Sequence, residues 1–184
     1  MRVAVYCSSA PEIDSKYLEL AHEVGQAIGA RGDELVWGGG TISMMGAVSR
    51  GARESGAKTF GIIPAKLFNI EFVDSEATET IEVANMRERK AMIEAMADAF
   101  IALPGGIGTL EEFFEIWVGR YLGFHSKPIA VVDPYGAFSP LRTALDNLAE
   151  LKFMKPGQNH LVHWTDNIES ALNSFSNLNA EDSL

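Results

Sequence analysis

The sequence is poor in cysteine, in positive charge and in long apolar runs. Cys7 is the single cysteine among 184 residues, which excludes an intramolecular disulfide and is typical of a reducing compartment. The formal net charge of −10 disfavours a nucleic-acid-binding surface. No apolar run approaches the roughly 18–20 residues that cross a bilayer, and the first residues lack the layout of a signal peptide. We therefore expect a cytoplasmic protein that binds neither nucleic acid nor membrane.

The signatures of several enzyme classes are missing as well. The four histidines are His22, His125, His160 and His163. Their spacing would not gather a metal ion, and Cys7 does not add to them. The G-x-S-x-G motif of a serine hydrolase is absent. At the end of a strand, Cys7 itself is better interpreted as a small buried residue than as a nucleophile. We expect no metal and no cofactor.

Short apolar strands alternate with amphipathic helices along the chain. Strands are predicted at residues 2–7, 34–37, 59–63, 80–83, 100–103, 129–132 and 161–164. Helices are predicted at 14–30, 43–55, 86–97, 107–121, 138–150 and 167–175. This alternation indicates a doubly wound parallel sheet in three α/β/α layers. The length suits one domain over residues 1–184, with a polar, frayed tail from Asn177 to Leu184.

The most informative stretch is Phe100–Glu112, where an apolar strand runs into a Pro-Gly-Gly turn and then a helix. The first amides of a helix lack intrahelical partners and carry partial positive charge, and glycines let an anion approach them closely. Thr109 adds a hydroxyl donor. The stretch is neither G-x-G-x-x-G, because Glu111 occupies the last glycine position, nor a P-loop. We predict a phosphate site, with a simple tight turn as the alternative.

Other polar groups fall at the same predicted edge of the sheet. Gly38-Gly39-Gly40 follows the second strand and forms either a second ligand-facing loop or a flexible crossover turn. Ser8 and Ser9 follow the first strand and are candidate ligand contacts. The segment 64–78, with Glu71, Asp74 and Glu76, is either a lid over the site or a solvated surface segment.

Cations at the start of the helix 86–97 are unusual. Arg87, Arg89 and Lys90 lie in its first turn, where positive charge opposes the helix dipole. Either one of them points at an anion, or the run is solvated and Glu88 is its partner.

These motifs together resemble one known family. Residues 104–112 match P-G-G-x-G-T-x-x-E letter for letter, and Met86, Arg89 and Lys90 fill an M-x-x-R-K pattern. With Gly38–Gly40, they resemble the Lonely Guy (LOG) family of cytokinin-activating phosphoribohydrolases, formerly labelled lysine decarboxylases, over roughly residues 1–150. The resemblance implies a Rossmann-like fold and a nucleoside 5′-monophosphate substrate. The products would be the free base and ribose 5-phosphate, with N6-substituted adenines as signature bases.

The resemblance also implies the site residues. Arg89 and Glu112 would be the catalytic pair. The substrate-binding positions would be Gly39, Gly40, Glu71, Lys90, Gly105, Gly106, Ile107, Gly108, Thr109, Leu110 and Glu111. Glu112 lies about one turn into the helix, where its carboxylate would stabilise an oxocarbenium-like ribose and orient the attacking water. Plant members often have Thr-Trp in place of Val118-Gly119, which leaves the preferred base open.

The same motifs allow two rival functions, and the apolar residues of the helix 107–121 bear on assembly. A nucleotide or molybdenum-cofactor carrier would use the same loop without chemistry, whereas nothing marks Lys90 as the Schiff-base lysine of a pyridoxal-phosphate decarboxylase. Phe113, Phe114, Trp117 and Tyr121 cover more of their helix than one core-facing stripe needs. The helix is therefore either buried all round or part of a subunit contact. LOG relatives are dimers or larger, so we expect a homodimer.

Overall fold

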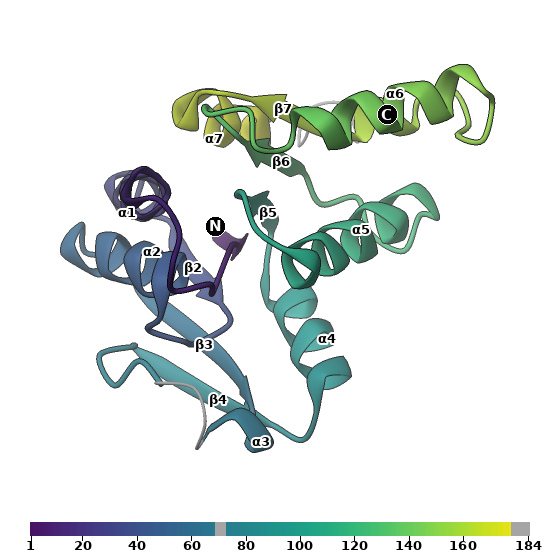
Figure 1. Ribbon diagram of the computed structural model, residues 1–184. Coiled ribbons are helices and arrows are strands. Elements are labelled where there is room, and N and C mark those ends of the chain that lie inside the picture. Colours follow the sequence, from purple (N-terminus) through teal and green to yellow (C-terminus); the bar gives the residue numbers. More distant parts are fainter. Residues whose placement is uncertain (69–72, 178–184) are drawn as a thin grey trace.

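Within residues 1–68 and 73–177, which the computed structural model describes, seven strands form one parallel sheet (Figure 1). They are β1 (Arg2–Tyr6), β2 (Glu34–Trp37), β3 (Thr59–Pro64), β4 (Glu79–Val83), β5 (Ala99–Ala102), β6 (Ile129–Val132) and β7 (Val162–Thr165). Their order is β4-β3-β2-β1-β5-β6-β7. The chain winds outward from β1 to β4 and then returns to β5 beside β1. The carboxyl ends of β1 and β5 therefore mark the switch point, where open α/β sheets bind ligands.

Helices cover both faces of the sheet. They are α1 (Ser15–Ala30), α2 (Ser43–Glu54), α3 (Ala65–Phe68), α4 (Met86–Met96), α5 (Ile107–Tyr121), α6 (Ser139–Glu150), the 3-10 helix η1 (Gln158–Leu161) and α7 (Ile168–Asn177). One core cluster joins α1, α2 and α7 to the sheet, and a second joins α4, α5 and α6 to its other face. Val3 and Val5 point into the first cluster and Ala4 and Tyr6 into the second, as the two-residue period of a strand requires.

The doubly wound parallel sheet and its elements were predicted correctly, with ends displaced by one or two residues. The short helices α3 and η1 were missed, because four residues are too few to show a helical period. The predicted site residue Glu71 and positions 178–184 of the predicted tail lie outside the described residues. None of the described helices has the length and apolar character to cross a membrane.

Candidate active site

A cavity of about 300 Å³ opens at the switch point, beyond the carboxyl ends of β1 and β5. Its described lining comes from the segment after β1 and from α2, α4 and α5: Cys7, Ser8, Ser9, Ala10, Met45, Met86, Arg89, Gly106, Gly108, Thr109, Glu111 and Glu112. The predicted catalytic pair, most of the predicted phosphate loop and the two candidate serines thus share one cavity. Met86 was matched to the M-x-x-R-K pattern but not assigned to the site, and Met45 was missed, because an apolar wall residue carries no chemical signal in the sequence.

The glycine turn before α5 has the geometry of an anion cradle. Gly106 caps the helix with φ −85°, and a Cβ atom added at Gly106 or Gly108 would meet nothing within 4 Å. Neither packing nor backbone conformation therefore requires glycine at these two positions, and the absence of side chains leaves their amides open to close approach. Gly105 differs, since its Cβ would lie 2.2 Å from Oγ1 of the buried Thr109. Gly105 lets the turn close over Thr109, while Gly106 and Gly108 leave room for an anion.

Glu112 is the half-buried carboxyl group of this cavity. Burial raises its pKa from 4.5 to about 7, and the charge of Arg89 works in the opposite direction. Glu111 and Glu115 raise the pKa further, whereas Lys90 lowers it. Near neutral pH the group can therefore both accept and release a proton, as general acid–base chemistry requires.

Arg89 is buried, with 7% of its surface exposed. Its Nε donates a hydrogen bond to the Ile62 carbonyl at 3.1 Å, and its Nη2 donates to the Gly38 carbonyl at 3.2 Å. A Cβ atom at Gly38 would lie 1.8 Å from Nη2, so this glycine makes room for the guanidinium. The interpretation of a solvated charge run is therefore wrong for Arg89. Glu88 instead caps α4, accepting from the Ala84 amide.

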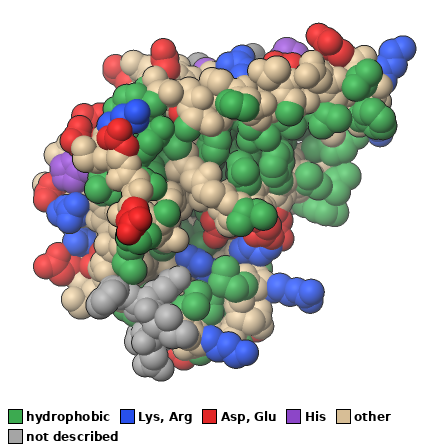
Figure 2. Space-filling view, viewed as in Figure 1, with side chains coloured by type: hydrophobic (Ala, Val, Ile, Leu, Met, Phe, Trp, Pro, Cys, Tyr) green, Lys and Arg blue, Asp and Glu red, His purple; other side chains and the backbone are tan. Residues whose placement is uncertain are grey.

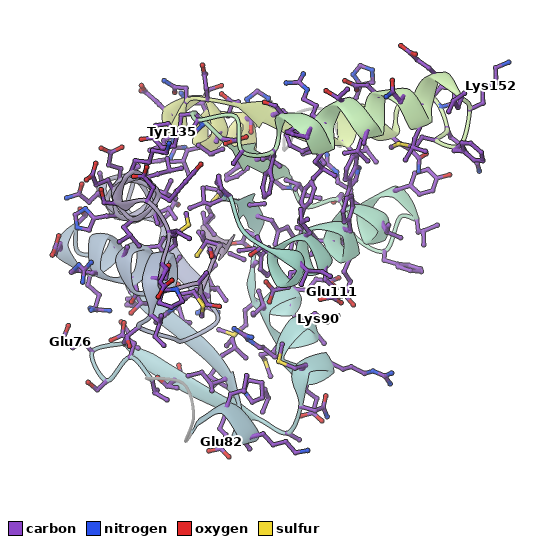
Figure 3. The ribbon with its side chains drawn as sticks, viewed as in Figure 1. Glu76, Glu82, Lys90, Glu111, Tyr135 and Lys152 are labelled. Carbon is purple, nitrogen blue, oxygen red and sulfur yellow. The ribbon has the colours of Figure 1, made fainter. Side chains whose placement is uncertain are left out.

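Lys90 lies next to the cavity without being among its described lining residues. Its Nζ pairs with Glu111 and, at 2.9 Å, with Oε2 of Glu115 (Figure 3). These two ion pairs join α4 to α5. The hydrogen bond to Glu111 is the main cause of its raised pKa. In this arrangement the ammonium group interacts with two carboxylates, and its predicted contact with substrate stays a prediction.

The remaining predicted binding positions differ in where their side chains or backbone lie relative to the cavity. Gly39 and Gly40 are not among the described residues that line the cavity. Ile107 is 88% exposed, and Leu110 packs partly against the core cluster of α4, α5 and α6. Cys7 is buried at the end of its strand, and burial raises the pKa of its thiol, which confirms the small-residue interpretation and disfavours a nucleophile.

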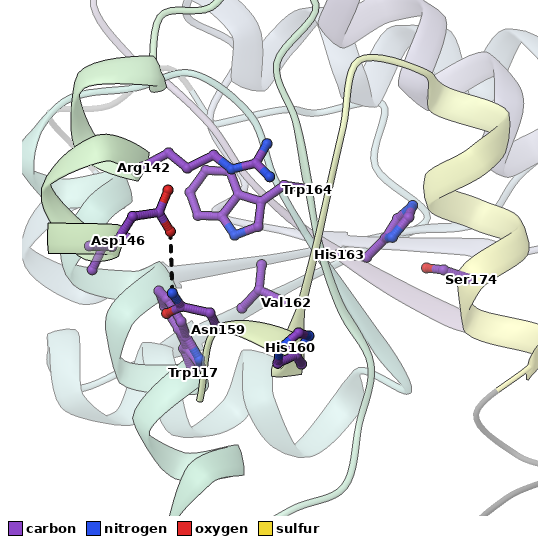
Figure 4. A pocket seen from close by; sticks show the side chains of 10 residues that line it. Trp117, Arg142, Asp146, Asn159, His160, Val162, His163, Trp164 and Ser174 are labelled. Atoms are coloured by element: carbon purple, nitrogen blue, oxygen red, sulfur yellow. Dashed lines mark hydrogen bonds between the residues drawn. The ribbon is translucent and has the colours of Figure 1, made fainter. Parts of the chain in front are cut away.

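A larger cavity of about 710 Å³ lies at the edge strand β7, between α6, η1 and α7 (Figure 4). Trp117, Arg142 and Trp164 line it, and its single described carboxylate, Asp146, accepts a hydrogen bond from Asn159 Nδ2 at 3.3 Å. This cavity is remote from the switch point and contains no glycine turn at the start of an α-helix. We therefore assign the candidate site to the smaller cavity, because of its chemistry rather than its size. No group of three or more His, Cys, Asp or Glu in residues 1–68 and 73–177 could hold a metal ion.

Comparisons with known proteins agree with this chemistry. Residues 45–175 match the family model described as "Possible lysine decarboxylase". The chain is 48% identical over 170 residues to a cytokinin riboside 5′-monophosphate phosphoribohydrolase of Mycobacterium tuberculosis, covering 92% of this chain and 90% of that protein. It is 40% identical over 160 residues to the phosphoribohydrolase LOG5 of Arabidopsis thaliana, covering 87% of this chain and 70% of the relative.

Solved structures resemble the chain in fold. The molybdenum cofactor binding protein of Rippkaea orientalis superposes with a TM-score of 0.73 at 22% identity, covering 96% of each chain. The molybdenum cofactor carrier protein of Chlamydomonas reinhardtii gives 0.72 at 20% identity over 98% of each chain. At such low identity these likenesses show the fold alone.

Proposed function

The chain belongs to the LOG family, and from this premise we propose that it is a phosphoribohydrolase acting on adenosine 5′-monophosphate or its N6-modified forms. The enzyme hydrolyses the N-glycosidic bond of the nucleotide. The oxygen of a water molecule bonds to C1′ of the ribose while the bond from C1′ to the base nitrogen breaks. The base takes up a proton and leaves as adenine or a cytokinin, and ribose 5-phosphate remains.

One observation carries the proposal: the Glu112 carboxyl group and the Gly106–Gly108 cradle face the same cavity at the switch point. With the 5′-phosphate at the start of α5, the ribose extends toward Glu112, one turn further along the helix. Ionised Glu112 stabilises the developing positive charge on the ribose and orients the water. Arg89, anchored through Nε and Nη2, directs further donors to phosphate or ribose.

The test is incubation of the purified protein with AMP, followed by chromatography for free adenine and ribose 5-phosphate. Glu112→Gln should bind AMP but lose on the order of 10²–10³ in kcat, because one charge contact in the transition state is removed. Near-normal turnover of this variant would assign the catalytic role to another residue. Running AMP beside N6-prenylated AMP gives the base preference.

The carrier alternative predicts AMP binding without any product. Its support is the likeness in fold to the two cofactor proteins, which reaches only 22% identity and says nothing of ligand. The identity of 48% to a phosphoribohydrolase favours the enzyme.

Assembly and location belong to the same proposal. Exposed Val118, Leu122 and Phe124 at the carboxyl end of α5 support a homodimer. The free thiol of Cys7 supports the cytoplasm as the site of action.

A further inference from the structure

The Gly38-Gly39-Gly40 turn is held from three sides. The Gly38 carbonyl accepts from Arg89 Nη2 at 3.2 Å, and the Gly39 carbonyl accepts from the Asp74 amide at 3.0 Å. The Gly40 carbonyl accepts from Trp37 Nε1 at 3.2 Å. Three glycines in sequence have more backbone freedom than any other tripeptide, so the turn depends on contacts such as these to keep one conformation. One of the three partners is the predicted catalytic arginine itself.

Asp74 is the most firmly anchored of these partners. Its side chain is buried, and its Oδ2 accepts from Ser49 Oγ and from Arg53 Nη1, both at 2.5 Å. Its Oδ1 accepts from the Glu76 amide at 3.0 Å. Ser49 and Arg53 lie on α2, so the carboxylate fastens the segment after residue 72 to this helix. Val73, directly before Asp74, pairs with Gly40 of the turn in an isolated antiparallel bridge.

We propose that Asp74, held by Ser49 and Arg53, is a positioning residue for Arg89, acting through the Gly38–Gly40 turn. The inference rests on the proposed function, because it concerns the placement of a group that the reaction uses. The path has two hydrogen-bonded steps: Asp74 to the Gly39 carbonyl, and the adjoining Gly38 carbonyl to the guanidinium. The other anchor of Arg89, the Ile62 carbonyl, belongs to β3 and does not depend on Asp74.

A buried ion pair is a poor way to gain stability alone, because well-packed apolar side chains often stabilise as much. What a carboxylate adds is direction, since Asp74 receives three donors from two different segments. Directional bonds restrict the turn to one geometry. This matters because a displacement of about 1 Å at a catalytic group can cost on the order of 10² in rate.

Asp74→Asn is the first test. Donors face both oxygens of the carboxylate, so an amide in either orientation sets its NH2 group against a donor. With AMP as substrate, kcat should fall by about 10- to 100-fold. In the pH profile of kcat/KM, the acid limb should also move to higher pH. Arg89 holds the pKa of Glu112 down, so a displaced guanidinium lets that pKa rise. The other charged groups that act on Glu112 are Glu111, Lys90 and Glu115, and none of them bonds to the glycine turn.

Asp33→Asn is the matched control. Asp33 is also buried and also paired, with the N-terminal amine at 2.7 Å and Arg31 Nε at 3.5 Å. It directly precedes β2, so it lies at the amino ends of the strands, whereas the cavity lies beyond the carboxyl ends of β1 and β5. Asp33→Asn should lower Tm but leave kcat and the acid limb unchanged. If both variants alter the acid limb equally, or if folded Asp74→Asn leaves kcat and limb unchanged, the positioning role is refuted.

Two further measurements keep the test decisive. Should Asp74→Asn fail to fold, Ser49→Ala removes one donor from Asp74 while keeping the ion pair, and it should shift the acid limb in the same direction. An unmoved limb would overturn the proposal. Hydrogen exchange at the Arg89 Nη2–H group, which donates to the Gly38 carbonyl, should be faster in the Asp74 variant when followed by nitrogen-15 NMR, and this readout needs no turnover. Wild-type protein that hydrolyses neither AMP nor N6-prenylated AMP would refute the proposed function, whereas unchanged exchange would refute the positioning role alone.

Discussion

At the residue scale, the ionisation of Glu112 determines the expected pH dependence. Burial raises its pKa to about 7, and in the proposed mechanism the carboxylate form stabilises the ribosyl cation. We expect kcat/KM for AMP to rise with pH through about 7 and then to level off. The phosphate of AMP titrates near pH ~6. Adenosine has no phosphate, so the same rise of kcat/KM with pH in its slow reaction would show that a group of the enzyme, and not the phosphate, titrates. Rates that stay constant from pH 6 to 8 with both substrates would contradict the assignment.

The same carboxyl group should destabilise the folded protein at alkaline pH. Its folded pKa of about 7 exceeds the ordinary value of 4.5, so the favourable contribution is complete below pH 4.5 and is lost as pH rises through about 7. Glu112→Gln cannot ionise and should be more stable than wild type at pH 8 by about 1–3 kcal/mol, discounted for partial exposure. Urea unfolding at pH 5 and pH 8 measures this. A stability difference independent of pH would count against it.

At the scale of elements, the proposed phosphate site at the start of α5 predicts that the substrate must carry a phosphate. Each charge-assisted hydrogen bond contributes about 1.5–3 kcal/mol, so two or three of them that retain about 3 kcal/mol after desolvation favour AMP over adenosine by more than ~100-fold in kcat/KM. The measurement compares both substrates with one enzyme preparation. Equal values would mean that the glycine turn does not bind phosphate.

Gly108→Ala sharpens that comparison. The new Cβ enters open space, so Tm should hold, while the AMP reaction should weaken by roughly tenfold or more and adenosine hydrolysis should change little. Gly105→Ala is the contrasting variant, because its Cβ would collide with Thr109 and lower Tm. If Gly108→Ala left the AMP reaction unchanged, the ligand would not approach this amide.

At the scale of the whole molecule, an uncovered apolar surface supports the proposed homodimer. Val118, Leu122 and Phe124 are 51%, 55% and 78% exposed, and Leu151 and Phe153 near the end of α6 are 68% and 79% exposed. Figure 2 shows hydrophobic side chains gathered over α5 and the neighbouring end of α6. Light scattering at micromolar protein should give twice the 20.0 kDa of one chain.

The variant Leu122→Glu/Phe124→Glu should give single chains, because two charges would be buried in the contact. Tyr135→Glu is the control, since Tyr135 is 46% exposed beside Tyr17 of α1, away from this surface. A wild-type mass near one chain would contradict the homodimer. An unchanged mass for the double variant would move the contact elsewhere.

The sequence by itself determined the strands, most helices and the glycine turn that begins α5. The inner strands are mostly apolar because helices cover both faces of the sheet, whereas the edge strands β4 and β7 also contain polar residues. The longer helices show a 3.6-residue period. The cradle is contiguous as well: β5, the turn at Pro104–Gly106 and the start of α5 are adjacent in the chain. Features of this kind depend on neighbours within a few residues, so local patterns contain them.

Only the tertiary structure decided the environment of the charged groups. Arg89 is buried because the Gly38 and Ile62 carbonyls, 51 and 27 residues away in sequence, meet it at the ends of β2 and β3. Lys90 of α4 pairs with Glu111 of α5, and burial in the cavity raises the pKa of Glu112. Burial and pairing are sums over groups that the fold brings together from distant segments. No local period or motif carries that information, because these environments form only when the strands pair and the helices pack on the sheet.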